Sequence, residues 1–407
     1  MTDRLRHPSA ALGIVLCLAL AAAACAPSNK AASSTTTSVP PLTTTTRAGA
    51  PAGTTVPSGF EPGSVTFVSS TTGFVIGVDS SCAAGACVAL ARTTDRGLGW
   101  VALPAPDAGY EARNYQGSTT AVPVSEVRFA DDLDGWIYGP SLFATHDGGT
   151  TWQEVSLGGS VISLETSGGY VDALVSPCTG VQGQECTGPL RLYQAQATGG
   201  GFSLVLTGPP VSSTSGVVLH LSLHAPVGFV NMSGVGGPGQ AFISATRNLA
   251  DTSGWKAFPD PCATSTDDGF DALVAPDTTS LYTLCSGQGA AGSVIKAVVR
   301  TVSGVSTVTG GPPAGGDPEA LAATSAGTLV VSAASGASWL YRSTDGGATW
   351  TTAETFDDGG IGFNDLGFTT STQGVVIHGV PGPPTNVASQ LLMTTDGGAS
   401  WSAVPIG

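Results

Sequence analysis

The chain has 407 residues, of which only 11% are charged, and its formal net charge is −15. So few charges exclude a coiled coil, which needs long Glu- and Lys-rich faces. An acidic surface repels phosphate backbones, so we expect no nucleic-acid partner. The same charge can favour cationic partners or keep an exposed protein in solution. The 57 Gly and 27 Pro residues fit many tight turns between short strands.

Residues 1–24 have the pattern of a secretory signal peptide. Two Arg residues precede an apolar run, Ala10–Ala24, that is shorter than a membrane span requires. The run ends in small residues directly before Cys25 and resembles a bacterial lipoprotein lipobox, in which the Cys thiol is diacylated. Ala22 stands where that family prefers a large aliphatic residue. We expect an exported protein held by lipid on Cys25 at the extracytoplasmic side of the membrane; ordinary cleavage and secretion are the alternative.

Residues 25–59 are rich in Ser, Thr and Pro and almost lack large apolar side chains. Such a segment cannot bury enough apolar surface to offset its ordering entropy, which predicts a disordered tether. Its composition also suits O-glycosylation. The predicted organisation is a signal peptide (1–24), a tether (25–59) and one β-propeller domain (60–407).

The eight Cys residues support the lipid anchor, because six remain once Cys17 leaves with the signal and Cys25 is lipidated. An oxidising compartment favours disulfides between them. We predict three local pairs: Cys82 with Cys87, Cys178 with Cys186, and Cys262 with Cys285. None of the spacings is Cys-x-x-Cys, so zinc is a poor competitor and no metal is expected.

One eight-residue pattern, [Ser/Thr]-x-Asp-x-Gly-x-x-Trp, occurs four times. The copies are Thr93–Trp100, Thr145–Trp152, Ser343–Trp350 and Thr394–Trp401. Each lies between strand-like segments, where the Asp carboxylate can accept backbone hydrogen bonds of its own turn and Gly can take positive φ. The Asp and Trp positions are therefore predicted to be structural: Asp95, Trp100, Asp147, Trp152, Asp345, Trp350, Asp396 and Trp401.

The copies recur at a step of about 50 residues, a period typical of propeller blades with four strands each. Trp152 and Trp350 are about four such steps apart, which leaves room for three degenerate copies. We place these at Thr198–Phe202, Trp255 and Ser303–Gly304. The prediction is an all-β, seven-bladed β-propeller of four-stranded antiparallel blades.

The repeat resembles the Asp-box (BNR) β-propeller family over roughly residues 60–407. The segment Val127–Trp152 is most similar to the branch of photosystem II assembly factors and related, sialidase-like bacterial lipoproteins. The resemblance implies propeller blades, but the Arg-Ile-Pro type motif of the sialidases is missing from the chain. The chain is expected to begin on an inner strand and to end on an outer one, with no strand exchanged between the first and last blades.

Two features are candidates for a functional site. The link Pro104–Val122 carries Tyr110, Arg113 and Tyr115, the chemistry of interface anchors. A glycosidase would instead need two carboxylates. The candidates, expected in loops and more typical of solvated surface charge, are Asp131, Asp132, Asp134, Asp267, Asp268, Asp271, Asp357, Asp358 and Asp365.

The sequence favours a non-enzymatic, monomeric binding or scaffold propeller at the bacterial envelope, without a cofactor. Its partner would be an envelope protein or a cell-surface polysaccharide. A divergent glycoside hydrolase and an assembly factor for a membrane complex are the alternatives.

Overall fold

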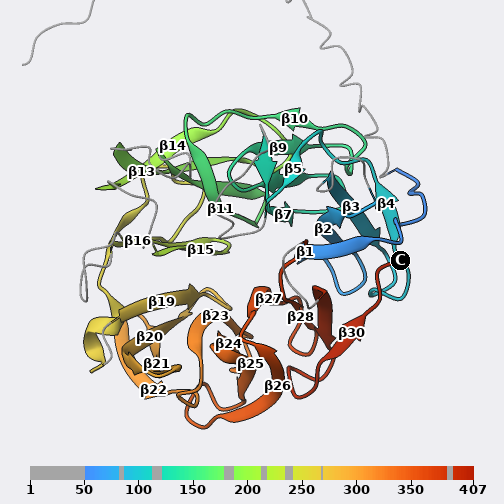
Figure 1. Cartoon of the computed structure of the whole chain (residues 1–407). Helices are drawn as coiled ribbons and strands as arrows, with labels where there is room; N and C mark the ends of the chain where they lie inside the picture. The colour runs from blue at the N-terminus through green and yellow to red at the C-terminus, as the bar shows by residue number, and fades with distance from the viewer. Residues whose placement is uncertain are drawn as a thin grey trace, which may run out of the picture. The chain divides into compact units, whose positions relative to one another are not determined.

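Seven antiparallel sheets follow one another along the chain, each containing four strands paired in sequence order. Figure 1 shows these sheets as blades around a central axis. The computed structural model describes residues 51–81, 87–111, 122–177, 188–211, 218–233, 242–266, 269–382 and 388–407. The predicted seven-bladed β-propeller is confirmed.

Each blade has an inner, a second, a third and an outer strand. The inner strands are β1 (Phe60–Phe67), β7 (Glu126–Phe129), β11 (Ser160–Ser167), β15 (Val218–His224), β19 (Gly269–Val274), β23 (Asp317–Ala323) and β27 (Phe363–Phe368). The second strands are β2 (Gly73–Asp79), β8 (Gly135–Tyr138), β12 (Tyr170–Ser176), β16 (Val227–Ser233), β20 (Ser280–Ala290), β24 (Leu329–Ala334) and β28 (Gly374–His378).

The third strands are β3 (Cys87–Thr93), β9 (Leu142–Thr145), β13 (Gly188–Gln196), β17 (Ile243–Thr246), β21 (Ser293–Val302), β25 (Gly336–Ser343) and β29 (Gln390–Thr394). The outer strands are β4 (Val101–Leu103), β10 (Gln153–Glu154), β14 (Ser203–Val211), β18 (Lys256–Phe258), β22 (Val305–Gly310), β26 (Thr351–Gly359) and β30 (Ser402–Val404). The first sheet also includes β5 (Gly109–Tyr110) and β6 (Pro123–Val124), and a 3₁₀-helix covers Pro261–Thr264.

The second strands carry much of the core because a blade packs against a neighbour on each side. All four residues of β8 and all five of β28 are buried. Strands covered on both faces have continuous apolar runs instead of alternation, as in Phe74–Ile76 of β2.

Strand direction assigns every connection to one of two faces, since neighbouring strands in a blade are antiparallel. The first face is where the inner strands begin, and the links between blades and between second and third strands lie there. The second face carries the turns between third and outer strands, which include the repeat turns. The innermost β1 packs on β27 and β28 and the outermost β30 ends the last sheet, so the ring closes without strand exchange, as expected.

The four repeat turns share one hydrogen-bond pattern. In the second blade the Thr145 hydroxyl donates to Asp147 Oδ1 (2.8 Å) and accepts from Gly149 N (2.9 Å). Asp147 Oδ1 also accepts from Thr151 N (2.9 Å). The other turns repeat these bonds around Asp95, Asp345 and Asp396. In one of them the hydrogen bonds from Thr349 lower the pKa of Asp345 to about 2.

An aromatic side chain ends the turn before six of the seven outer strands and packs into the core between that blade and the preceding one. We call these side chains the wedge aromatics: Trp100, Trp152, Phe202, Trp255, Trp350 and Trp401. All three predicted degenerate copies lie between third and outer strands, which explains the correct blade count.

The predicted disulfide between Cys262 and Cys285 is present. Cys87 is disulfide-bonded, whereas its predicted partner Cys82 lies outside the described residues. Cys25, Cys178 and Cys186 also lie outside them. Across the described ranges, no helix has the length and apolar character needed to cross a bilayer.

Candidate functional site

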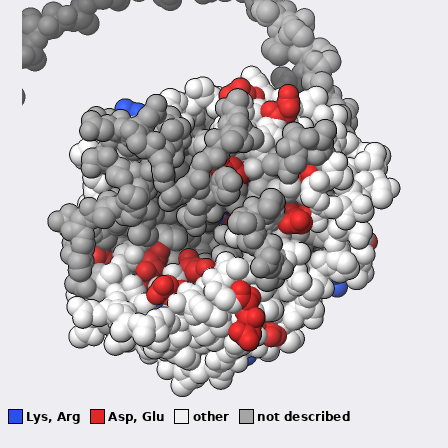
Figure 2. All heavy atoms as spheres, in the orientation of Figure 1, with Lys and Arg blue, Asp and Glu red and all other residues white. Residues whose placement is uncertain are grey.

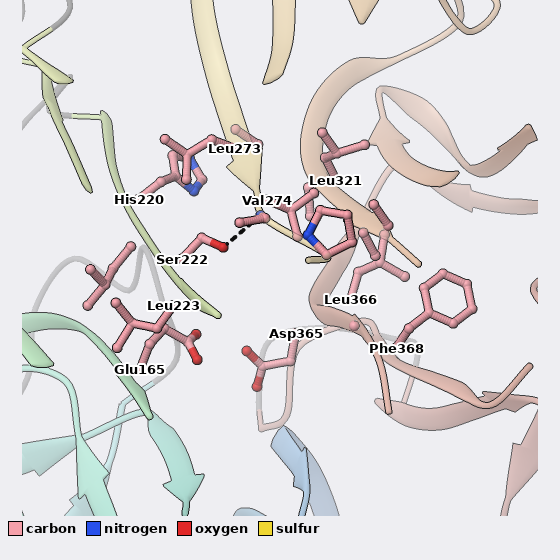
Figure 3. A pocket seen from close by; sticks show the side chains of 18 of the residues that line it. Glu165, His220, Ser222, Leu223, Leu273, Val274, Leu321, Asp365, Leu366 and Phe368 are labelled. Atoms are coloured by element: carbon pink, nitrogen blue, oxygen red, sulfur yellow. Dashed lines mark hydrogen bonds between the residues drawn. The ribbon is translucent and has the colours of Figure 1, made fainter. Parts of the chain in front are cut away.

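A cavity of about 680 Å³ occupies the centre of the propeller and is lined by the inner strands of blades two to seven. This volume lies within the range typical of ligand sites. Figure 3 shows Glu165, His220, Ser222 and Asp365 among the polar side chains that line it. The inner strands leave room here because many of their cavity-lining positions hold small or aliphatic residues.

Arg128 of β7 is the cation that lines this cavity. Its Nε lies 3.1 Å from Glu165 Oε1, and its Nη2 lies 3.3 Å from Asp365 Oδ1. Its Nη1 donates to the carbonyl oxygen of Val127 (2.9 Å). Burial alone would lower the pKa of Arg128, but Glu165 and Asp365 raise it well above its usual range. The guanidinium therefore stays charged and joins blades two, three and seven.

Asp365 connects the same cluster to the first blade. It takes a left-handed conformation, with φ at 54°, which Asp tolerates better than most residues. Its Oδ2 accepts hydrogen bonds from the Ser64 hydroxyl and from Val65 N (2.9 Å). Ser64 Oγ in turn accepts from Val127 N (3.0 Å). These bonds join the first and second blades to the last one, so the cluster has a structural role. We call Ser64, Arg128, Glu165 and Asp365 the clasp.

A second group of carboxyls gathers on the first face, where inner strands begin. We call Asp271, Asp317, Glu319 and Asp358 the acidic mouth. Burial raises the pKa of Asp271 to about 7, with a further contribution from Asp317. Burial and then the charges of Asp358 and Asp317 raise the pKa of Glu319 to about 7. Figure 2 shows acidic side chains around the central hollow of this view and few basic ones.

The mouth holds unused hydrogen-bonding capacity. Asp271 Oδ1 accepts from the Ser286 hydroxyl (3.1 Å), while its buried Oδ2 has no hydrogen-bond partner in the part of the chain that the structure describes. Lys296 Nζ is a nearby cation, but its three N–H donors are shared among four carbonyl oxygens within 3.1 Å, including those of Pro313 and Gly315. Burial lowers the pKa of Lys296 to about 8. A buried carboxylate oxygen without a donor favours an incoming cation.

The pair of Asp358 and His378 lies at the same mouth but lacks the arrangement of a nucleophile site. Asp358 Oδ2 is 2.7 Å from His378 Nε2 and accepts from the Ser338 hydroxyl at 2.7 Å. In a catalytic triad the His would instead lie between the Asp and the Ser. His378 is buried beneath Phe356, whose ring stacks on it at 4.1 Å.

The predicted site residues lie in separate places. The repeat-turn residues lie on the second face, away from the acidic mouth. Tyr110 is buried in the first blade against Gly63, and Arg113 and Tyr115 lie outside the described residues. Among the described residues, no three or more His, Cys, Asp or Glu side chains are placed so that together they could hold a metal ion.

Four of the Asp residues expected as solvated loop charge are placed differently by the structure, among them Asp358, which lies on β26 with its side chain only 5% exposed. Asp365 and Asp271 lie on inner strands, and Asp134 is completely buried with His146 Nδ1 at 2.6 Å from its carboxylate. That expectation was wrong because Asp271, Asp358 and Asp365 lie within strands, while Asp134 ends the β7–β8 turn with its carboxylate buried against His146. Asp267 and Asp268 lie outside the described residues, while Asp131, Asp132 and Asp357 are exposed.

The residues missed by sequence reasoning are Arg128, Glu165 and Glu319. Arg128 stands between the apolar Val127 and Phe129, and the polar position of an alternating inner strand faces the axis. That signal was present in the sequence. Glu319 gave none, since its environment depends on Phe363 of blade seven and on Asp358 of the outer strand of its own blade.

No protein-family model and no curated protein matches the chain. Among solved structures, YCF48 from Cyanidioschyzon merolae is similar at 14% identity and a TM-score of 0.50, over 85% of this chain and 96% of that one. A YCF48 bound to a D1 peptide matches at 17% identity and 0.49, over 85% and 94%. A prolyl endopeptidase matches at 11% and 0.53, over 86% of this chain and 51% of the other. The likenesses at 0.50 and 0.53 show a shared fold, and fold alone does not give function.

Replacing Arg128 tests the clasp. The change Arg128→Met leaves the buried carboxylate of Asp365 without its cation, so the free energy of unfolding should fall by about 3–5 kcal/mol. Urea denaturation measures this change in the free energy of unfolding. Arg96→Met, at an exposed turn position, is the control and should change stability by less than about 0.5 kcal/mol. Equal stability of the two variants would contradict a structural role for Arg128.

Proposed function

We propose that this chain is an exported, lipid-anchored binding propeller of the Asp-box type, whose acidic mouth takes a basic segment of an envelope protein. The observation that carries the proposal is the buried Asp271 oxygen, which has no hydrogen-bond partner among the described residues. It belongs to a group of carboxyls on the first face, of which Glu319 also lines the central cavity. A Lys or Arg side chain would supply the missing donor and relieve the repulsion between Asp271 and Asp317.

Binding fits the cavity better than hydrolysis. A glycosidase needs one carboxyl held protonated beside one held ionised, both facing the substrate. Glu165 and Asp365 instead share the guanidinium of Arg128, and ion pairing with Arg favours the ionised form of a carboxyl. The divergent hydrolase stays the second candidate. Glu319 lines the cavity with a pKa raised to about 7, and it lies near Asp358, whose pKa, in spite of burial, is lowered by hydrogen bonds from Ser338 and His378.

A blocked pentalysine peptide tests the mouth by calorimetry at pH 6 and pH 8. In the chain without bound peptide, Asp271 and Glu319 have pKa values of about 7. They are protonated below that pH and ionised above it, and a cation favours the ionised form. Binding should therefore release protons and be about tenfold tighter at pH 8 than at pH 6.

The double variant Asp271→Asn with Glu319→Gln should lose this pH dependence. Asp131→Asn with Asp132→Asn removes the same charge from the exposed β7–β8 turn and should keep it. Equal behaviour of the two double variants would contradict the mouth as the binding site. Turnover of a glycan by the chain, lost in Asp365→Asn, would contradict the binding proposal and favour the hydrolase.

The anchor has a separate test in cells that acylate lipoproteins. The full chain should incorporate radiolabelled palmitate, and Cys25→Ser should abolish incorporation. Cys17→Ser, within the apolar run, is the matched control and should retain the label. Release of the unlabelled wild-type chain into the medium would instead show ordinary secretion.

A further inference from the structure

One blade interface lacks its wedge aromatic. In blade five the third and outer strands are joined by the two-residue turn Ser303–Gly304, and the outer strand begins with the exposed Val305. The core between blades four and five accordingly contains no aromatic side chain from a repeat turn. This interface is the exception among the seven, all of whose turns are described.

A cavity of about 300 Å³ lies at this interface. Blade four contributes Phe229 and Phe258, whose rings meet edge to face at 5.4 Å, and blade five contributes Leu281 and the turn Ser303–Gly304. In the second blade the corresponding wedge, Trp152, likewise meets a phenylalanine ring edge to face. The cavity therefore has the location and lining of a wedge site without its own ring.

The same interface is held together by other means. Cys262 precedes blade five, and its disulfide to Cys285 of β20 ties the connection to that blade near the first face. The cavity lies toward the second face, where it is lined by the β19–β20 and β21–β22 turns. A disulfide stabilises the folded chain, so the interface can tolerate a missing ring.

Cations gather around this cavity in a chain that has only 14 Lys and Arg residues. Arg247 and Lys256 line it, and both are exposed. Arg300 is not part of this group, because its guanidinium lies over the Tyr282 ring on the side of blade five that faces blade six. The nearby carboxylate of Asp251 accepts from the backbone and hydroxyl of Ser253 within its own turn. It also interacts with the charge of Lys256, whose Nζ donates to Ser253 O at 2.9 Å, so Arg247 is the cation with fewer interactions in this group.

We propose that this cavity binds a partner polypeptide through an aromatic side chain flanked by acidic residues. The ring would take the place of the missing wedge, and the acidic neighbours would meet Arg247 and Lys256. We expect the aromatic ring to come from a polypeptide, because at the other six interfaces the ring is a side chain of a peptide segment. The site is on the second face and is independent of the acidic mouth.

Calorimetry of the full chain, purified in detergent, tests this with blocked tripeptides. Asp-Trp-Asp should bind, while Asp-Ala-Asp and Asn-Trp-Asn should bind at least about tenfold more weakly or not at all. In the same preparation, the tripeptides should leave the binding of pentalysine at the acidic mouth unchanged. The two proposals can therefore fail separately. Equal binding of all three tripeptides, or no binding of Asp-Trp-Asp, would overturn the inference.

Variants locate the binding. Ala257→Trp, from an exposed position of β18 that lines the cavity, should fill it and weaken Asp-Trp-Asp at least about tenfold. Thr352→Trp, at the corresponding position of β26, is the matched control and should bind as the wild type does.

The contribution of the positive charge of Arg247 to binding is tested separately. Arg247→Gln should weaken binding about two- to fivefold, whereas Arg96→Gln, beside a filled interface, should not. Unchanged affinity in both Ala257→Trp and Arg247→Gln would place the peptide elsewhere and overturn the site. Circular dichroism verifies the fold of each variant, and the comparison of tripeptides decides the question if Ala257→Trp does not fold.

Discussion

The packing of one aromatic ring between neighbouring blades is the interaction on which the ring of sheets depends. A four-stranded blade cannot cover both of its faces, so every interface must bury the apolar runs of two second strands. The repeat turn solves this locally. Its Ser or Thr hydroxyl and Asp carboxylate hold the turn closed, and the Trp that follows enters the core of the preceding interface. Turn chemistry and long-range packing thus come from the same eight residues.

The polar groups divide into those used by the fold and those left for a partner. Arg128, Asp365 and Ser64 satisfy one another and connect the first blades to the last. Asp271 keeps a buried oxygen without a donor, and its raised pKa reflects the cost of that burial. The difference is geometric: a guanidinium reaches the first group, whereas Lys296 is occupied by backbone carbonyls beside the second.

Much of the fold was predictable because it repeats. Four clear turns and their spacing predicted the blade count. Two of the degenerate copies could be located because Phe202 and Trp255 keep an aromatic residue at the Trp position of the repeat. The site was less predictable, since inward-facing residues of different blades meet only when the ring closes. Asp365 and Ser64 are the clearest example: they are hydrogen-bonded although 301 positions separate them in the sequence, and neither belongs to a motif.

Amide hydrogen exchange of the full chain tests the role of the turns and their rings most directly. The amides of Gly97, Gly149, Gly347 and Gly398 donate to the buried hydroxyl of each repeat turn, beneath a wedge aromatic. We expect the amides of these four turns to exchange slowly, and those of the Ser303–Gly304 turn, which no wedge aromatic covers, to exchange much faster. Equal protection of all five turns would contradict the claim that the rings close the interfaces.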